Sequence, residues 1–291
     1  MSRLDELKTQ LDQAVEDDES PACLQAICAD MLEKTGIHEI RLYLEAARYR
    51  TAAYAALFER IDEPADGDPD ILDTLDTVIQ ATPKPDDDHL FAFDDPIQHL
   101  YWHKRQDPHC RQYPAPLGTL YQRKGDELAK RGLWKLALGA YENAMRWNPA
   151  NARLCARRAQ LYEFDDEEMF LKLVRAALYD AYEPADFAYI YRCLMKHYSD
   201  DPSIAVCFGV LAVMWNGSEG LFAEISQLGV ALPSPKKLES ALALKELPCW
   251  LSPEKVQAFE QLRDEYPELE EAFSHILDGF SGMVDREKLN L

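Results

Sequence analysis

Hydrophobic positions recur along the chain at intervals of three and four residues, the spacing that places side chains on one face of an α-helix. Ala, Leu, Glu, Lys and Arg supply most of this pattern, whereas runs rich in Val, Ile and Thr are few. These residue types favour helix over sheet, and the presence of only 12 glycines points the same way. The sequence therefore predicts an all-α protein.

The N-terminal part of this pattern predicts two helices. The first is expected from Cys23 to Lys34 and ends at Gly36, a residue typical of helix C-termini. The second is longer and is expected from about Ile37 to Arg60. Together they predict a helical N-terminal segment over residues 1–60.

The pattern changes between residues 61 and 95, where acidic residues and prolines surround one short apolar segment, Ile71 to Ile79. Closely spaced prolines and acidic residues are typical of loops. We interpret residues 61–95 as an acidic, Pro/Asp-rich loop excursion. It would separate the N-terminal segment from a helical array over residues 96–291.

In the C-terminal part, prolines preceded by Ser, Asp or Glu predict helix starts, since proline is tolerated in the first helical turn. The apolar stretch from Ile204 to Trp215 is expected to be a buried helix, because twelve residues are too few to span a bilayer. We therefore expect no membrane segment. The four prolines with this predicted role are Pro184, Pro202, Pro235 and Pro253.

Residues 118–151 contain the most specific pattern in the chain. Gly125 and Ala137 are small at the places where two antiparallel helices would cross, and Pro149 would end the second helix. This 34-residue unit resembles a tetratricopeptide repeat, the helix–turn–helix module of helical solenoids. Lys124 and Leu128 depart from the family pattern, which has an apolar and an aromatic residue there. The residues that carry the resemblance are Tyr121, Gly125, Leu128, Gly132, Ala137, Tyr141, Ala144 and Pro149.

The resemblance implies that TPR-like helical hairpins stack in a curved α-solenoid. A degenerate second unit would begin at Ala152. Helix pairs that begin near Asp186 and Pro202, and near Pro235 and Pro253, are expected to continue the stack. Neighbours are physically required, because a lone repeat cannot bury its own hydrophobic face.

The net charge of −21 is unevenly distributed: residues 1–95 carry −16, residues 96–161 carry +8 and residues 162–291 carry −13. The one basic block coincides with the recognisable repeat. Acidic flanks would repel a polyanion, so nucleic acid is an unlikely partner in spite of aromatic residues within the basic block.

The resemblance also implies a binding surface, because the family binds peptides along the face formed by the first helix of each repeat. Arg123, Arg153 and Arg157 occupy repeat positions at which a subfamily holds a peptide's C-terminal carboxylate. Gln122 and Asp126 replace the Lys and Asn usual in that subfamily. We therefore expect a non-enzymatic scaffold that binds a polypeptide, one of acidic character, around Arg123, Asp126, Arg153 and Arg157.

Two other interpretations of the basic block stay open at this point. Its arginines would be either an ordinary solvated face or the internal partners of the chain's own acidic segments. In the second case the array would be self-inhibited, because the chain's own acidic segments would cover the basic block at residues 96–161.

Histidines gather between residues 89 and 110. His99 and His103 lie four apart, the helical spacing of a metal-binding pair, and His109 and Cys110 follow. An alternative function is therefore a metal-binding enzyme or sensor using His99, His103, His109 and Cys110. The sequence contains no phosphate-binding glycine loop, nucleophile elbow or metalloprotease motif, so the main prediction is a non-enzyme without a cofactor.

The cysteines and the N-terminus predict the compartment. Seven cysteines are scattered without CxxC spacing, which suits reduced thiols. The first residues lack the apolar run of a secretory signal. We therefore expect a cytoplasmic protein.

Overall fold

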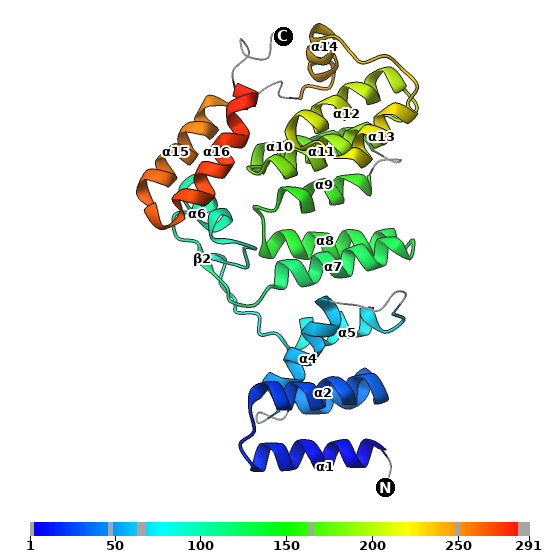
Figure 1. The fold of residues 1–291 in the computed structure, drawn as a ribbon, viewed down its shortest axis with the longest axis vertical. Helices are drawn as coiled ribbons and strands as arrows, with labels where there is room; N and C mark the ends of the chain where they lie inside the picture. Colours follow the sequence, from blue (N-terminus) through cyan, green and yellow to red (C-terminus); the bar gives the residue numbers. More distant parts are fainter. Residues whose placement is uncertain (1–2, 46–48, 63–67, 163–165, 248–250, 285–291) are drawn as a thin grey trace. The chain divides into compact units, whose positions relative to one another are not determined.

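The computed structural model describes the whole chain except residues 1–2, 46–48, 63–67, 163–165, 248–250 and 285–291 (Figure 1). Three quarters of it is helical, so the all-α prediction is confirmed. Strand is confined, in the described residues, to two parallel two-residue segments that pair Leu90 with Arg111 and Phe91 with Gln112.

The elements of the described residues follow one another as α1 (Arg3–Glu16), α2 (Pro21–Thr35), α3 (Ile37–Glu45), α4 (Arg50–Asp62), α5 (Ile71–Ala81), β1 (Leu90–Phe91), α6 (Pro96–Arg105), β2 (Arg111–Gln112), α7 (Leu117–Lys130), α8 (Trp134–Trp147), α9 (Ala152–Gln160), α10 (Glu167–Asp180), α11 (Pro184–His197), α12 (Pro202–Asn216), α13 (Glu219–Gln227), α14 (Pro235–Leu244), α15 (Pro253–Glu265), a 3-10 turn (Pro267–Leu269) and α16 (Glu270–Val284). No helix among them has the length and apolar character needed to cross a membrane.

The chain divides into two compact units. Unit 1 comprises residues 1–87 and 119–140, and unit 2 comprises residues 88–118 and 141–291. The predicted boundaries at residues 60 and 95 differ from this division, because contacts between residues distant in sequence, rather than local composition, define each unit.

In unit 1, α2 packs against α1, α3 and α4, and α5 packs against α3 and α4. The helix predicted from Cys23 to Lys34 is confirmed as α2, which ends at Gly36 with a φ of 74°. The single helix predicted from Ile37 to Arg60 is replaced by α3 and α4, which pack against each other. Each thereby buries an apolar face that one long helix would leave without a partner.

The segment predicted as a loop over residues 61–95 contains a helix, α5, at the apolar stretch that starts at Ile71. Leu75 and Val78 of this helix are fully buried against its neighbours. The described prolines and several of the acidic residues around it are exposed, whereas most apolar residues of the segment face the core. Residues 63–67 lie outside the described part.

The unit that resembles a tetratricopeptide repeat forms α7 and α8, with a tight turn between them. Gly132 adopts a φ of 73° in this turn, and its N–H donates to Ala129 O at 2.9 Å. A left-handed φ suits glycine, which has no Cβ to clash. The predicted helix–turn–helix is therefore present, while membership in the repeat family stays a prediction. Of the residues that carry the resemblance, Gly125, Ala137, Tyr141 and Ala144 are buried, and Tyr121 and Pro149 are half-buried.

In unit 2, α11 and α12 form the most closely packed helix pair, and α9 and α10 pack beside α11. The predicted helix starts at Pro184, Pro202, Pro235 and Pro253 are all confirmed. The apolar stretch from Ile204 to Trp215 is confirmed as part of α12, the helix at the centre of this core.

The helices that begin at Pro235 and Pro253 were predicted to pair with each other, but the structure pairs them with other helices. α14 packs against α12, whereas α15 packs against α16 and α6 (Figure 1). Phe259 of α15 accounts for this arrangement: it is fully buried and contacts the rings of Phe273 and Phe280. Aromatic side chains of this size select the neighbour that can enclose them.

A glycine contact on α16 gives a testable measure of how closely α16 and α11 pack. A Cβ added to Gly279 would lie 2.3 Å from Pro184 Cγ, and the proline ring has little freedom to move. We expect Gly279→Ala to lower the free energy of unfolding by about 1–3 kcal/mol through overpacking. Urea unfolding of Gly279→Ala, Pro184→Ala and the double variant measures this. An effect of Gly279→Ala that persists in full with Pro184→Ala would contradict the assigned contact.

Candidate functional site

Arg123, the first of the predicted peptide-binding arginines, lies on α7 in unit 1 and contacts the end of α4. Its guanidinium donates to Ile61 O and forms an ion pair with Asp62, with 3.0 Å between Nη2 and Oδ1. Asp126 lies one turn further along α7 and is half-buried. The chain's own acidic segment therefore supplies an anionic partner for Arg123.

Arg153 and Arg157 lie on α9 in unit 2, four residues apart as predicted. Arg153 Nε donates to Asp186 Oδ1 at 2.5 Å and Nη2 lies 3.5 Å from Glu183 Oε2. Arg157 lies over the Tyr189 ring, 5.9 Å from its centroid. Burial raises the pKa of Asp186, and the Arg153 charge opposes that shift. A groove that unites these arginines with Arg123 stays a prediction.

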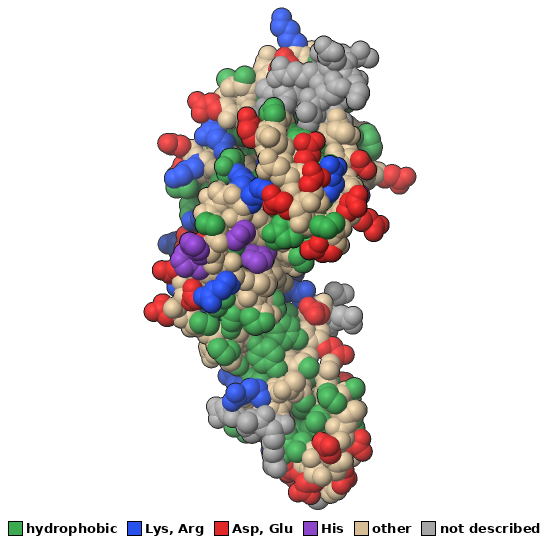
Figure 2. All heavy atoms as spheres, turned by 90° about the vertical axis from the view of Figure 1, so that its left-hand side faces the viewer, with side chains coloured by type: hydrophobic (Ala, Val, Ile, Leu, Met, Phe, Trp, Pro, Cys, Tyr) green, Lys and Arg blue, Asp and Glu red, His purple; other side chains and the backbone are tan. Residues whose placement is uncertain are grey.

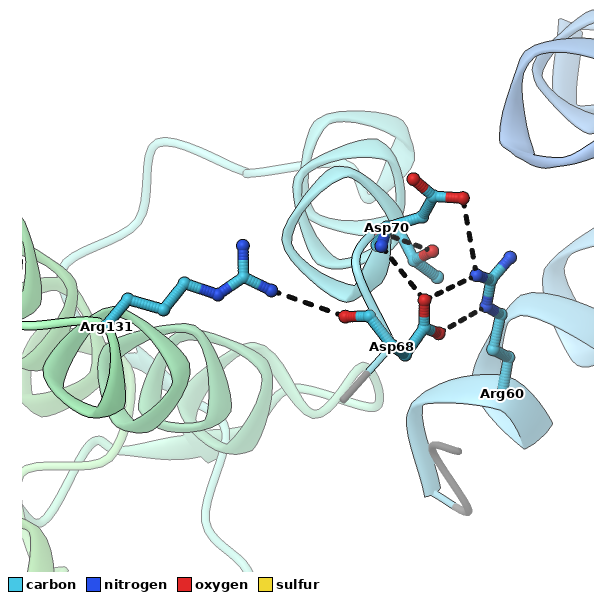
Figure 3. Close-up of polar contacts among 5 residues, drawn as sticks. Arg60, Asp68, Asp70 and Arg131 are labelled. Carbon is cyan, nitrogen blue, oxygen red and sulfur yellow. Dashed lines mark hydrogen bonds and ion pairs between the residues drawn. The ribbon is translucent and has the colours of Figure 1, made fainter. Parts of the chain in front are cut away.

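Other cations of the basic block also meet acidic residues of the chain. Lys124 pairs with Asp76 on α5, and Arg131 donates to the backbone oxygen of Asp68 at 3.3 Å. Asp68 in turn accepts two hydrogen bonds from Arg60, at 2.7 and 2.8 Å (Figure 3). These contacts are of the kind expected if the chain's own acidic segments cover the basic block. That they restrain binding of a partner stays a prediction.

The histidine segment brings together three of the four predicted metal ligands. His99 and His103 lie on α6 with ring centroids 6.3 Å apart, and Cys110 Sγ lies 4.0 Å from His103 Nδ1 (histidines purple in Figure 2). His109 lies instead against the ring of His89. The His99 ring stacks on Phe93, an arrangement typical of packing. Within the described residues, no cluster of three or more His, Cys, Asp or Glu side chains has a geometry that could hold a metal ion.

Unit 2 contains a pocket that the sequence did not indicate. It has a volume of about 290 Å³, just below the range typical of ligand sites. Helices α10, α11, α12 and α15 and the chain before α15 form its walls. Its lining is mostly aromatic and aliphatic: Leu178, Tyr179, Phe187, Tyr191, Trp215 and Leu251, with Ser252 and the charged residues Arg175, Glu246 and Lys255.

Trp215 and Phe187 form one wall of this pocket. Their rings stack with centroids 4.0 Å apart and an angle of 13° between the planes. Trp215 is only 8% exposed, and its Nε1–H meets no hydrogen-bond acceptor among the described residues. A buried N–H without an acceptor costs free energy, so the packing of the two rings is obtained at some cost in stability.

Lys255 lies at the inner side of the pocket and is 8% exposed. Its Nζ donates to Leu178 O at 3.2 Å, Tyr179 O at 2.7 Å and Ala181 O at 2.5 Å, carbonyls at the C-terminal end of α10. Burial lowers the pKa of Lys255 to about 7, and the nearby Arg105 charge acts in the same direction. Three carbonyl acceptors match the three N–H donors of the ammonium form, so its hydrogen bonds are committed within the chain.

The mouth of the pocket carries one ion pair. Arg175 donates from Nη2 to Lys245 O at 2.9 Å and from Nε to Glu246 O at 3.3 Å, and Nη2 lies 3.2 Å from the Glu246 carboxylate. Glu246 is 81% exposed on its side chain and adopts a φ of 53°. Such an exposed ion pair is weak, so the carboxylate can be displaced from Arg175 at low cost.

No local pattern in the sequence indicates this pocket, because its residues come from α10, α11, α12, α15 and the chain before α15, between residues 175 and 255. One signal was available: Lys255 stands among apolar residues of an amphipathic helix. Its burial depends, however, on where α15 packs.

Comparison with protein-family models, with curated proteins and with solved structures finds no match to this chain.

Proposed function

We propose that the protein is a non-enzymatic scaffold that binds a polypeptide, with the pocket of unit 2 receiving one bulky apolar side chain. The supporting observation is the pocket itself, a cavity of about 290 Å³ with aromatic walls on a helical framework. Peptide-binding helical proteins hold their ligands through such anchor pockets, because burying one large side chain supplies much of the binding free energy.

This proposal places the ligand differently from the prediction made from the sequence. The predicted site around Arg123, Arg153 and Arg157 consists of side chains that already contact other groups of the chain. A partner would have to replace those contacts before it gained any binding free energy. The pocket of unit 2, in contrast, is an existing cavity.

The proposal is tested with a displayed random-peptide library selected on the full chain. Peptides with a bulky apolar residue should be enriched, and their affinity should fall about tenfold in Tyr179→Ala, because Tyr179 lines the pocket and is 58% exposed. Phe222→Ala is the matched control, since Phe222 is 54% exposed and lies outside the lining. Enrichment at background level, or equal binding by both variants, would refute the proposal.

A further inference from the structure

The hairpin of α7 and α8 turns through seven consecutive exposed residues, 130–136, which we call the hairpin tip (Figure 1). Three of them are large and apolar: Leu133, Trp134 and Leu136 are 44%, 57% and 60% exposed. The buried face of α8 begins only at Ala137, so these side chains contribute little to the core of unit 1. Large apolar side chains that gather on the surface among charged residues mark an interaction site.

The charges of the hairpin tip are all positive. Lys130, Arg131 and Lys135 lie in it, and no acidic residue occurs between residues 127 and 142. Lys130 pairs with Glu127 over one turn of α7, an exposed contact that contributes little free energy. Arg131 donates to a backbone oxygen, Asp68 O, at 3.3 Å. The tip therefore presents one tryptophan and two leucines among cations.

The pocket of unit 2 has a surface that complements this tip. Its walls are aromatic and aliphatic, and its volume of about 290 Å³ suits one side chain better than a separate small molecule. Glu246 of the lining has a side chain that is 81% exposed, and Glu254 at the start of α15 is exposed as well. The cations around the pocket, Arg105, Arg175 and Lys245, are half-buried. Carboxylates are therefore its most exposed charges.

From these two surfaces we infer that the pocket of unit 2 receives Trp134 from a second copy of this chain. The indole would lie between the aromatic walls, and the two leucines of the tip would cover the rim. Lys135 would meet the Glu246 carboxylate, which is held only by an exposed ion pair with Arg175. The inference rests on the function proposed above, because it specifies the side chain and the partner that the pocket accepts.

Charge and exposure favour a second copy as the source of the indole. Trp134 is 57% exposed in its own chain, so it does not fill the pocket there. Two copies that each carry −21 repel one another, and the cationic tip offsets this repulsion where it meets residues 162–291, which carry −13. Because each copy carries both a tip and a pocket, the contact is heterologous and can join successive copies.

Sedimentation equilibrium of the full chain at several concentrations tests for this association. We expect complexes larger than the monomer that dissociate on dilution. Trp134→Ala and Tyr179→Ala should each weaken the association about 10- to 100-fold, because each removes one side of the buried aromatic contact. Phe222→Ala is the matched control, since Phe222 is 54% exposed and lies outside both the tip and the pocket lining. It should associate like the unaltered chain.

A mixture of the two weakened variants tests which surfaces meet. The Tyr179→Ala chain keeps its tip and the Trp134→Ala chain keeps its pocket, so together they should form 1:1 complexes that extend no further. An unaltered chain that is monomeric at every concentration, association unchanged by either substitution, or a mixture that stays monomeric would each overturn the inference. Thermal melting of every variant establishes that lost association is not lost folding.

The random-peptide library described above, selected on the Trp134→Ala chain, separates this inference from the proposed function. If the unaltered chain is monomeric while peptides with a bulky apolar residue are enriched, the pocket accepts a different polypeptide and only the inference is refuted. Enrichment at background level together with a monomeric chain refutes both.

Discussion

Replacing Lys255 by methionine is expected to lower the free energy of unfolding of unit 2 by about 2–4 kcal/mol. The substitution leaves the carbonyls of Leu178, Tyr179 and Ala181 without the ammonium that joins α15 to the end of α10. Removing a buried amino group also removes its desolvation cost, but three carbonyl groups then lose their hydrogen-bond donor. Each buried carbonyl without a donor costs about 1–3 kcal/mol, so the loss should outweigh the relief.

Urea unfolding followed by tryptophan fluorescence and helical circular dichroism measures this change. Lys236→Met is the matched control, since Lys236 is exposed on α14 and its replacement should change stability by less than about 0.5 kcal/mol. If Lys255→Met were as stable as the control, Lys255 would not be a structural link between the two helices.

Replacing Asp68 by alanine is expected to lower the free energy of unfolding of unit 1 by about 2–4 kcal/mol. The Asp68 side chain is 6% exposed, accepts two hydrogen bonds from Arg60 and accepts a third from Asp70 N at 2.9 Å (Figure 3). Its removal leaves Arg60 partly buried without this partner. The expected loss of stability is smaller than for a fully buried ion pair, because the Arg60 side chain is 21% exposed.

The same interaction predicts a pH dependence. The hydrogen bonds from Arg60 hold the pKa of Asp68 below its ordinary value of 3.8. A carboxyl with a lowered pKa in the folded state stabilises that state fully above the unfolded value and loses the contribution as pH falls through the folded value. The stability difference between the unaltered chain and Asp68→Asn should therefore be constant from pH 7 to 5 and shrink below about pH 4.

Asp86→Asn is the matched control for the amide substitution, since Asp86 is an exposed acid of the same region. It should change the free energy of unfolding by less than about 0.5 kcal/mol at pH 7. A stability gap for Asp68→Asn that stayed constant down to pH 3, where the whole chain remained folded, would show that the ion pair does not stabilise unit 1.

The two arginines Arg153 and Arg157 of α9 show why the binding site was harder to predict from the sequence than the fold. The spacing of Arg153 and Arg157 correctly placed both on one helix. It carried no information on Asp186, which lies 33 residues beyond Arg153 and accepts its hydrogen bond. Whether a cation is available to a ligand depends on such distant partners, and charge spacing along one helix does not reveal them.

Local signals determined much of this protein by themselves. Prolines after Ser, Asp or Glu marked four helix starts, Gly36 marked a helix end, and the apolar stretch from Ile204 marked a buried helix. Each of these features acts over one turn of helix or less, through a capping hydrogen bond, a missing N–H or a permitted φ. The all-α class follows from signals of the same range, the three- and four-residue spacing of apolar positions and the helix-favouring residue types.

Only the tertiary structure decided which helices pack together and what they enclose. Phe259 directs α15 to α16 rather than to α14, and the same packing carries Lys255 to the end of α10 and closes one wall of the pocket. Periodicity identifies the face of a helix that must be buried, but many helices offer an apolar face. The partner is selected by side-chain shape and by buried polar groups that require one another, and both depend on residues far apart in the sequence.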